Sequence, residues 1–516
     1  MEPIHSTIED SREGVPTLII YDTNGKKVYL HSAVRPSREA DSLREELASS
    51  PDGLLIVLGV GLGYHLHSLA GSRTPDRPAV LIERLPDIER HLEAVPGSRF
   101  LSGTDGITIL AGIEPDTLAS TLDGIIDFSR IGSLRVVEHP ASMRAFGDYY
   151  RAIRSVIEAL VRKKAGDAAA RRAFGYRYLK NALINCGSLG SLTPVSALFE
   201  RFTGRPALVV MPGPSLDGAL DEVRAYARRA VVIAADSALP VLSAAGIDVH
   251  FCVSIDPQGY TWEHCGRMPD PAPVMVCSLT ANPRLIRRGD ALLSLNSHPI
   301  AQLIDQLCPD AIGSIDSTTG NVAGDAVYFA HLLGCAPIGI VGFDSCFSRY
   351  RIYARGSAYQ NRFARLFHDR FQPIETQNLR YIRVSSRAYR EQGRFTRRSF
   401  TAYNATLARF IAARRIGGIA HVNPDGLPIE GVPAADLAAI MEHAPPVTDD
   451  LRALIAGCIA SAPSLADLVD VAAIRRALVV PENADAVLRA SLDDKTLVKR
   501  GPAITGIMTR LLGGGR

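Results

Sequence analysis

Three short apolar runs lie within residues 207–256, ALVVMPGPSLDGALDEVRAYARRAVVIAADSALPVLSAAGIDVHFCVSID. The first is too short for a helix, and a segment of helical apolar spacing follows it, so the stretch predicts parallel strands joined by helices. The runs end near Ser215, at Asp236 and at Asp256. Because the carboxyl ends of parallel strands share one edge of a sheet, we expect these side chains to line one crevice. A capped turn and two solvated loop acids are the alternative.

The turn after the first run, residues 211–215, has a composition that suits an anion. Gly213 lets the backbone approach a ligand closely, and Ser215 is a good residue to cap the following helix. Free N–H groups at a helix start also attract phosphate. We therefore expect this turn to contact a phosphorylated ligand.

Two later turns offer similar groups. Residues 317–321 form a hydroxyl-rich turn before an apolar helix, where side-chain oxygens and backbone donors suit a phosphate or a carboxylate. The buried strand PIGIVGFD brings Gly342 and Asp344 to a loop. An ordinary helix cap is the alternative for residues 317–321.

Length and composition limit the protein class. A chain of 516 residues is too long for one ordinary core, so two or three domains are expected. The net charge is +3, and the absence of a long Lys/Arg run means that nothing demands a nucleic-acid partner. The eight cysteines are scattered singly, which predicts reduced core residues. No apolar run reaches the ~18 residues of a spanning helix, so we expect a cytoplasmic protein without a membrane segment.

The fold class predicted from these patterns is α/β. We expect a Rossmann-like accessory domain at 1–148, a helical connector at 149–190, a central α/β catalytic domain at 191–432 and a helical C-terminal domain at 433–516. Residues 345–402 are rich in Arg, Tyr and Ser, which predicts a lid that holds an anionic substrate.

The N-terminal region predicts a hairpin around the turn Thr23-Asn24-Gly25 and a helix over residues 38–49. A strand then opens into Gly59-Val60-Gly61-Leu62-Gly63, and the next strand ends at Glu83, the arrangement of nucleoside-binding Rossmann domains. A tight turn in a domain that binds nothing is the alternative. Because no methyl-acceptor motif follows, we expect an accessory module without methyl-transfer activity that helps to position the protein acceptor or a partner subunit.

The central motifs resemble those of the motility accessory factor family, whose domain is related to the archaeal 6-hydroxymethylpterin diphosphokinases (MptE-like, DUF115). The matching segments are Gly213-Pro214-Ser215-Leu216, Asp236-Ser237-Ala238, Gly246-Ile247 leading to Asp256, Thr319-Gly320-Asn321-Val322 and Gly342-Phe343-Asp344, with His31-Ser32, Glu39 and residues 58–66 in the N-terminal part. A looser similarity exists to bacterial sialyltransferases that use a CMP-sugar. The chain departs from the family pattern at Met211-Pro212 and at Ser345-Cys346.

This resemblance implies a sialyltransferase-like Rossmann domain that transfers a nonulosonic acid from its CMP ester to Ser or Thr of flagellin, for flagellar assembly and motility. It leaves three candidates for the general base: Asp256, Asp344 and His368. The expected nucleotide-sugar contacts are Gly213, Pro214, Ser215, Asp236, Ser237, Ser317, Thr318, Thr319, Gly320 and Asn321. No metal ligand is assigned, and the oligomeric state is left open.

Two alternatives from other classes stand beside this one. A diphosphokinase would move pyrophosphate from ATP to a hydroxymethylpterin, with Asp236, Asp256 and Asp344 holding Mg²⁺. The flanking domains suit a macromolecular acceptor better than a small pterin. A non-catalytic nucleotide-binding scaffold is the second alternative, because a fold does not determine a function.

Overall fold

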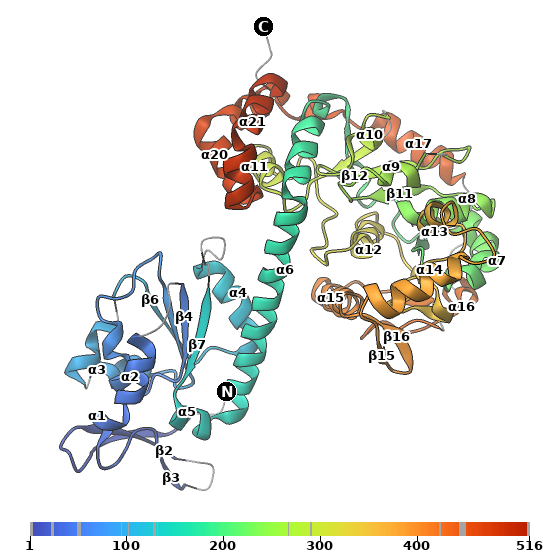
Figure 1. Cartoon of the computed structure of the whole chain (residues 1–516). Helices are drawn as coiled ribbons and strands as arrows, with labels where there is room; N and C mark the ends of the chain where they lie inside the picture. The colour runs from blue at the N-terminus through green and yellow to red at the C-terminus, as the bar shows by residue number, and fades with distance from the viewer. Residues whose placement is uncertain are drawn as a thin grey trace. The chain divides into compact units, whose positions relative to one another are not determined.

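The computed structural model describes residues 4–21, 25–48, 53–93, 95–101, 103–126, 131, 133–266, 268–288, 291–422, 425–442 and 450–512. The chain divides into two compact units, Met1–Ala169 and Ala170–Arg516 (Figure 1). Both contain a parallel sheet with helices, so the predicted α/β class is confirmed. The predicted domain boundaries at 148, 190 and 432 stay predictions. None of the helices in the described ranges is long and apolar enough to cross a membrane.

The first unit contains a parallel sheet of order β6-β5-β4-β7 and an antiparallel sheet of order β1-β2-β3. Its strands are β1 (Ser6–Asp10), β2 (Pro16–Tyr21), β3 (Lys27–Tyr29), β4 (Leu54–Leu58), β5 (Ala79–Glu83), β6 (Ile107–Ala111) and β7 (Leu134–Glu138). Its helices are α1 (Pro36–Glu39), α2 (Asp41–Ala48), η1 (Tyr64–Leu69), α3 (Ile88–Glu93), η2 (Pro96–Leu101), α4 (Pro115–Ile125), α5 (Pro140–Ala145) and the first part of α6 (Gly147–Cys186).

Side chains of β4 alternate between two cores, because successive residues of a strand point to opposite faces. Leu55 and Val57 pack on the side of α2 and α3, whereas Leu54 and Ile56 pack on the side of α4 and α6 (Figure 1). Both faces of this sheet are therefore covered by helices.

Strands β2 and β3 form the predicted hairpin. Its turn residues Thr23 and Asn24 lie outside the described residues, as does Ser49 at the end of the predicted helix. That helix is divided at Ala40 into α1 and α2, and Asp41 supplies the acidic residue that favours a new helix start. The pairing of β1 with β2 was not predicted.

The glycine turn at residues 59–63 is filled by the chain's own side chains. The Glu83 carboxylate accepts hydrogen bonds from the N–H groups of Val60 (2.7 Å) and Gly61 (3.1 Å). The ring of His31 accepts a further N–H of the turn (2.7 Å), and a Cβ atom at Gly61 would overlap with this ring. Several of the backbone donors that hold a nucleoside in other Rossmann domains are thus already bonded within the protein. The accessory role of this unit stays a prediction.

Three buried histidines lie beside this turn. The rings of His65 and His139 stack with centroids 4.7 Å apart, and the His31 ring lies 5.1 Å from that of His139. Each side chain is nearly inaccessible to solvent. Burial lowers the pKa of all three, and that of His139 falls to about 4. The surroundings of the three rings therefore favour their neutral forms.

The second unit is built on one parallel sheet of eight strands, in the order β17-β14-β9-β10-β11-β12-β13-β8. Its strands are β8 (Thr193–Pro194), β9 (Ala207–Val210), β10 (Val231–Ala235), β11 (Phe251–Ser254), β12 (Val274–Ser278), β13 (Ala291–Ser294), β14 (Ile338–Val341) and β17 (Ile419–Val422). The predicted strands of residues 207–256 are β9, β10 and β11. A small hairpin, β15 (Tyr389–Glu391) and β16 (Arg394–Thr396), lies in the predicted lid.

Helices cover both faces of this sheet. Up to residue 332 they are the last part of α6, η3 (Leu189–Ser191), η4 (Val195–Leu198), α7 (Leu216–Tyr226), η5 (Ala227–Arg229), η6 (Asp236–Ala238), α8 (Leu239–Ala244), α9 (Thr261–His264), α10 (Pro283–Ile286), α11 (Pro299–Leu307) and α12 (Val322–Leu332). Then follow η7 (Ser348–Tyr350), α13 (Ala358–Ala364), α14 (Ile374–Arg380), η8 (Tyr381–Ser385), α15 (Arg398–Arg414), α16 (Leu437–Glu442), α17 (Leu451–Ser461), α18 (Leu465–Leu468), α19 (Val471–Val479), α20 (Pro481–Ser491) and α21 (Asp494–Leu512).

Strand β9 shows how the two faces are used. Leu208 and Val210 enter the core that α6, α7 and the C-terminal helices share, whereas Ala207 and Val209 enter the core that α12, α15 and α17 share. Strands buried on both faces explain the continuous apolar runs in the sequence. The predicted C-terminal helices are present, and they belong to the same compact unit as the sheet.

The strand order reverses between β9 and β14. From β9 the chain adds β10 to β13 on one side, and it then returns through α12 to place β14 on the other side of β9. Ligands of open α/β sheets bind at the carboxyl ends of strands at such a reversal. The loops after β9 and β14 therefore mark one part of the candidate site.

We predict that the stability of the first unit falls as the pH is lowered from 6.5 toward 4. The unfolded chain protonates His139 near pH 6.5 and the folded chain only near pH 4, so the contribution present above pH 6.5 is lost across this window. A pKa shift of this size lowers the free energy of unfolding at pH 5 by about 2 kcal/mol relative to neutral pH. Hydrogen exchange of peptides from β4 and β5 measures this in the whole chain.

The variant His139→Asn should show a smaller increase in exchange between pH 7 and pH 5, whatever its baseline stability. The matched control is His368→Gln, because His368 is exposed and lies in the other unit. An unchanged pH dependence of exchange in His139→Asn would show that protonation of His139 does not destabilise the first unit.

Candidate functional site

The loops after β9 and β14 are joined by the side chain of Asp344. Its carboxylate accepts a hydrogen bond from the Ser215 N–H (2.8 Å) and another from the Ser215 hydroxyl. Gly213 donates its N–H to the Gly342 carbonyl (2.9 Å), and a Cβ at either glycine would overlap with the opposite loop. Two segments that are 129 residues apart are thus fixed to each other at the strand reversal.

This contact changes what the β9 turn can do. Ser215 occupies the N-cap position of α7, as predicted, but its hydroxyl does not cap the helix, because it donates to Asp344. The N–H groups of Gly213, Ser215 and Leu216 are all used within the protein. The turn positions its neighbours rather than presenting these donors to an anion.

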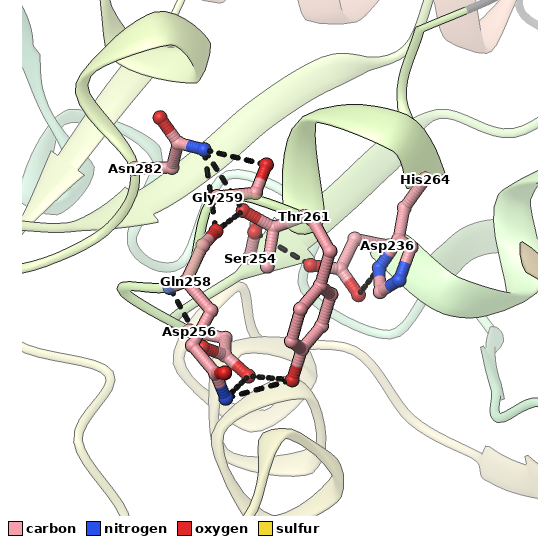
Figure 2. Close-up of polar contacts among 9 residues, drawn as sticks. Asp236, Ser254, Asp256, Gln258, Gly259, Thr261, His264 and Asn282 are labelled. Carbon is pink, nitrogen blue, oxygen red and sulfur yellow. Dashed lines mark hydrogen bonds and ion pairs between the residues drawn. The ribbon is translucent and has the colours of Figure 1, made fainter. Parts of the chain in front are cut away.

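Asp236, at the end of β10, is held together with a histidine. One carboxylate oxygen accepts a hydrogen bond from the Ser254 hydroxyl (2.7 Å), and the other accepts one from Nδ1–H of His264 (3.1 Å) (Figure 2). Both side chains of the Asp–His pair are mostly buried. With Nδ1 donating to the carboxylate, Nε2 of His264 is left as the proton-accepting atom of the ring.

Asp256, after β11, lies beside this pair. Its carboxylate accepts hydrogen bonds from the Gln258 N–H (2.9 Å) and the Tyr260 hydroxyl (3.0 Å) (Figure 2). Burial raises the pKa of Asp256, and the nearby carboxylate of Asp236 adds to this, whereas the two hydrogen bonds and His264 oppose it. The structure thus brings Asp236 and Asp256 together, as the strand topology predicted.

Asn282 supports the loop that carries these residues. Its amide lies within hydrogen-bonding distance of the Gln258 and Gly259 carbonyls and the Thr261 hydroxyl, at 3.3–3.4 Å (Figure 2). The start of α9 is therefore fixed from the neighbouring strand end, and this fixes His264 in turn.

In the turn at residues 317–321, Ser317 and Thr319 are buried, whereas other residues are exposed. The Ser317 hydroxyl donates to buried Asp325 (2.6 Å), and the Thr319 hydroxyl lies 2.8 Å from that of Ser317. Burial raises the pKa of Asp325 to about 7. Asn321 caps α12 through its side-chain oxygen.

The outward groups of this turn remain available to a ligand. Thr318 and Gly320 are exposed. Over the described part of the chain, the N–H groups of Gly320 and Asn321 have no hydrogen-bond partner. These groups, rather than the buried hydroxyls, are the phosphate donors that the turn can offer.

Tyrosines connect this turn with the aspartates. A Cβ at Gly320 would lie 3.8 Å from the Tyr403 ring of α15. The pKa of Tyr353 is raised mainly by burial, with smaller contributions from both Tyr403 and Asp236. Tyr353 therefore lies within electrostatic range of both sides of the site, as expected for a residue of the predicted lid. The Ala354 N–H donates to the Pro212 carbonyl (2.8 Å), which fixes this part of the lid to the β9 turn.

The remaining predicted residues are distributed as follows. Pro214 is buried in the β9 turn, and Ser237 is partly exposed in η6. His368 is exposed after α13, and no hydrogen bond of its ring is found among the residues that the structure describes. The site therefore gives His368 no partner, and His264, which was not predicted, is the histidine at the strand ends.

The diphosphokinase alternative requires three aspartates around one ion. Within the described ranges, no three His, Cys, Asp or Glu side chains are placed to share a metal ion. Asp344 bonds Ser215, and Asp236 bonds Ser254 and His264. Asp236, Asp256 and Asp344 thus do not form the shared ligand set of that alternative.

A family model described as 6-hydroxymethylpterin diphosphokinase MptE-like matches residues 180–350. This part of the chain is similar to that family. The match includes β9 to β14 and all the hydrogen-bonded aspartates above, so the resemblance predicted from the motifs is supported.

Two further comparisons extend this finding. The structure of the MAf glycosyltransferase from Magnetospirillum magneticum AMB-1 superposes with a TM-score of 0.60 and 14% identity, covering 99% of this chain and 87% of that one. The shared fold therefore includes both units and the MptE-like region. An uncharacterized protein of Treponema pallidum (strain Nichols) is 32% identical over 92 residues, which are 18% of this chain. The chain spans 43% of the length of that curated relative.

We predict that Asp344→Asn destabilises the protein more than Asp256→Asn does. The introduced asparagine lacks the charge that strengthens the two hydrogen bonds from Ser215 to the buried Asp344 side chain, and a hydrogen bond to a charged group contributes about 1.5–3 kcal/mol against about 1 kcal/mol for a neutral one. Asp256 is partly exposed, so its replacement should change the melting temperature by only a few degrees. Thermal unfolding of the two full-length variants measures the difference. Equal melting temperatures would show that Asp344 does not hold the two loops together.

Proposed function

We propose that the protein is a glycosyltransferase that moves a nonulosonic acid from a CMP-activated donor to Ser or Thr of flagellin. The observation that carries the proposal is the His264–Asp236 pair at the carboxyl ends of the strands, in a fold shared with a MAf glycosyltransferase. The named donor and acceptor come from the family resemblance. The chemistry follows from the side chains.

In this reaction the acceptor hydroxyl attacks the anomeric carbon, and the bond to the CMP oxygen breaks with its electron pair. The acceptor must lose a proton, and Nε2 of His264 is the base that the geometry offers, with Asp236 holding the ring and stabilising its protonated form. Such a pair contributes typically 10²–10⁴-fold to a rate.

The departing CMP carries a phosphate whose charge must be stabilised. The free N–H groups of Gly320 and Asn321 and the exposed hydroxyl of Thr318 are suited to this. Asp256, fixed by Tyr260 and Gln258, is left to bind the sugar or nucleotide hydroxyls. A divalent ion, if the reaction uses one, would bind mainly through phosphate oxygens, since Mg²⁺ often takes only one or two carboxylates from a protein.

We expect CMP to stabilise the full chain in a thermal-shift assay more than ATP or GTP, with CTP between them. A ligand at 100 times its dissociation constant adds about 2.7 kcal/mol. Mg²⁺ is included and then removed with a chelator. Selective stabilisation by ATP with Mg²⁺ would favour the diphosphokinase alternative instead, and no response to any nucleotide would contradict the proposal.

We further predict that His264→Gln lowers the transfer rate by about 10²-fold or more and leaves CMP binding within about threefold. Gln keeps a donor for Asp236 but cannot take a proton. Radiolabelled sugar transfer to purified flagellin measures the rate, and His368→Gln is the matched control. A fully active His264→Gln enzyme would exclude His264 as the base.

A further inference from the structure

A cavity of about 980 Å³ lies between the first turn of α7 and the lid segment. Asp217 and Gly218 form one wall, and residues of η7, α13, α14, η8 and β16, together with Arg351 and Arg355 of the loop between η7 and α13, form the others. Asp236, Asp256 and His264 do not line it. The cavity is therefore distinct from the site described above.

The charge of this cavity is positive. Arg349, Arg351, Arg355 and Arg383 line it, against the acids Asp217 and Glu375. Arg351 forms an ion pair with Asp217, and Arg349 lies 3.7 Å from Asp425, which is outside the cavity. The side chains of Arg355 and Arg383 are exposed and, as far as the described residues show, have no partner. Two unpaired guanidinium groups thus face a cavity whose four lining arginines outnumber its two lining acids.

Apart from Gln360 and Asn378, the rest of the lining is mostly apolar. Ile382 is buried and Ile374 and Phe395 are half-buried, whereas Leu379 and Tyr350 are 39% and 55% exposed. The surrounding lid also exposes large apolar side chains, since Phe371 is 87% and Val384 is 70% exposed. Exposed apolar side chains of this number on one segment are typical of a surface that binds another chain. A small anion needs the arginines but not these groups.

The cavity is connected to the strand ends through the start of α7. Asp217 lies two residues after Ser215, which Asp344 fixes at the strand reversal. Asp217 also accepts the N–H of Arg355 (2.9 Å), so the arginine-bearing loop is fixed to α7. A polypeptide bound here would lie beside the first site.

We propose that this cavity binds an acidic, leucine-containing segment of the protein that accepts the sugar. The proposal rests on the proposed function for the identity of the acceptor, and on charge complementarity and the exposed apolar lining for its chemistry. Arg355 and Arg383 pair with its carboxylates, and the apolar lining residues contact its aliphatic side chains. The cavity thereby holds the acceptor protein near the strand ends through a segment other than the residue whose hydroxyl reacts.

The test uses fluorescence anisotropy of the full chain with a short labelled peptide of repeating Glu, Leu, Asp and Ser. A peptide with Lys in place of Glu and Asp is the charge control. Arg355→Glu and Arg383→Glu should each weaken binding by about tenfold or more, because a like charge then faces the peptide. Arg228→Glu is the matched control, since Arg228 is also exposed but follows the opposite end of α7. Leu379→Ser should weaken binding without changing its salt dependence.

Thermal shift with CMP is measured on the same variants. Unchanged CMP binding with lost peptide binding supports the proposal. Equal peptide binding by wild type and both arginine variants overturns it, as does equal weakening by Arg228→Glu or equal binding of the Lys peptide. Loss of CMP binding in the arginine variants also overturns it, because the cavity would then belong to the donor site. Peptide binding without any CMP response supports this cavity and contradicts the proposed function alone.

Discussion

The hydrogen bonds between Ser215 and Asp344 hold the site together. They connect the two loops where the strand order reverses between β9 and β14, and their acceptor, the Asp344 carboxylate, is buried, where a charge-assisted hydrogen bond is strong. Helix α7 starts at this bond, and its first turn forms a wall of the arginine-lined cavity. Ala354, in the segment predicted to form a lid, is fixed to the same turn through its hydrogen bond to Pro212. The strand-end site and the cavity, which differ in chemistry, thus depend on one carboxylate.

Much of the fold was predictable because the strands of the second unit are buried on both faces. Runs such as ALVV and VVIAA have no helical alternative of sufficient length, and Gly, Pro or Asp ends each of them. The alternation of such runs with helices requires a parallel sheet, and a parallel sheet brings Asp236 and Asp256 to one edge. The β1 strand was missed because its polar sequence, STIED, carries no apolar run.

The site was less predictable, because residues at strand ends have the same pattern whether they bind a ligand or the protein itself. Asp344 and Asp256 both follow buried strands. They differ in that Asp344 bonds Ser215, which lies 129 residues away in the sequence, and the local pattern does not show this contact. His264 lies in a single turn of helix, and its contact with Asp236 arises because β11 pairs beside β10. The one signal for Asp325 was a carboxylate within the otherwise apolar helix VAGDAVYFAHLL. Its partner Ser317 had instead been expected to face a nucleotide.

Helix α6 is shared by the cores of both units, and this limits how the chain can be cut. Tyr150, Ile153 and Ile157 fill one face of the first sheet, whereas Leu179 and Leu183 fill the core of the second unit. An expression fragment that stops at residue 148 would keep α4 but lose α6 from the face of the sheet that carries Leu54 and Ile56, and would expose part of this core to water. A usable fragment of the first unit has to continue at least through Leu160, which closes the same core.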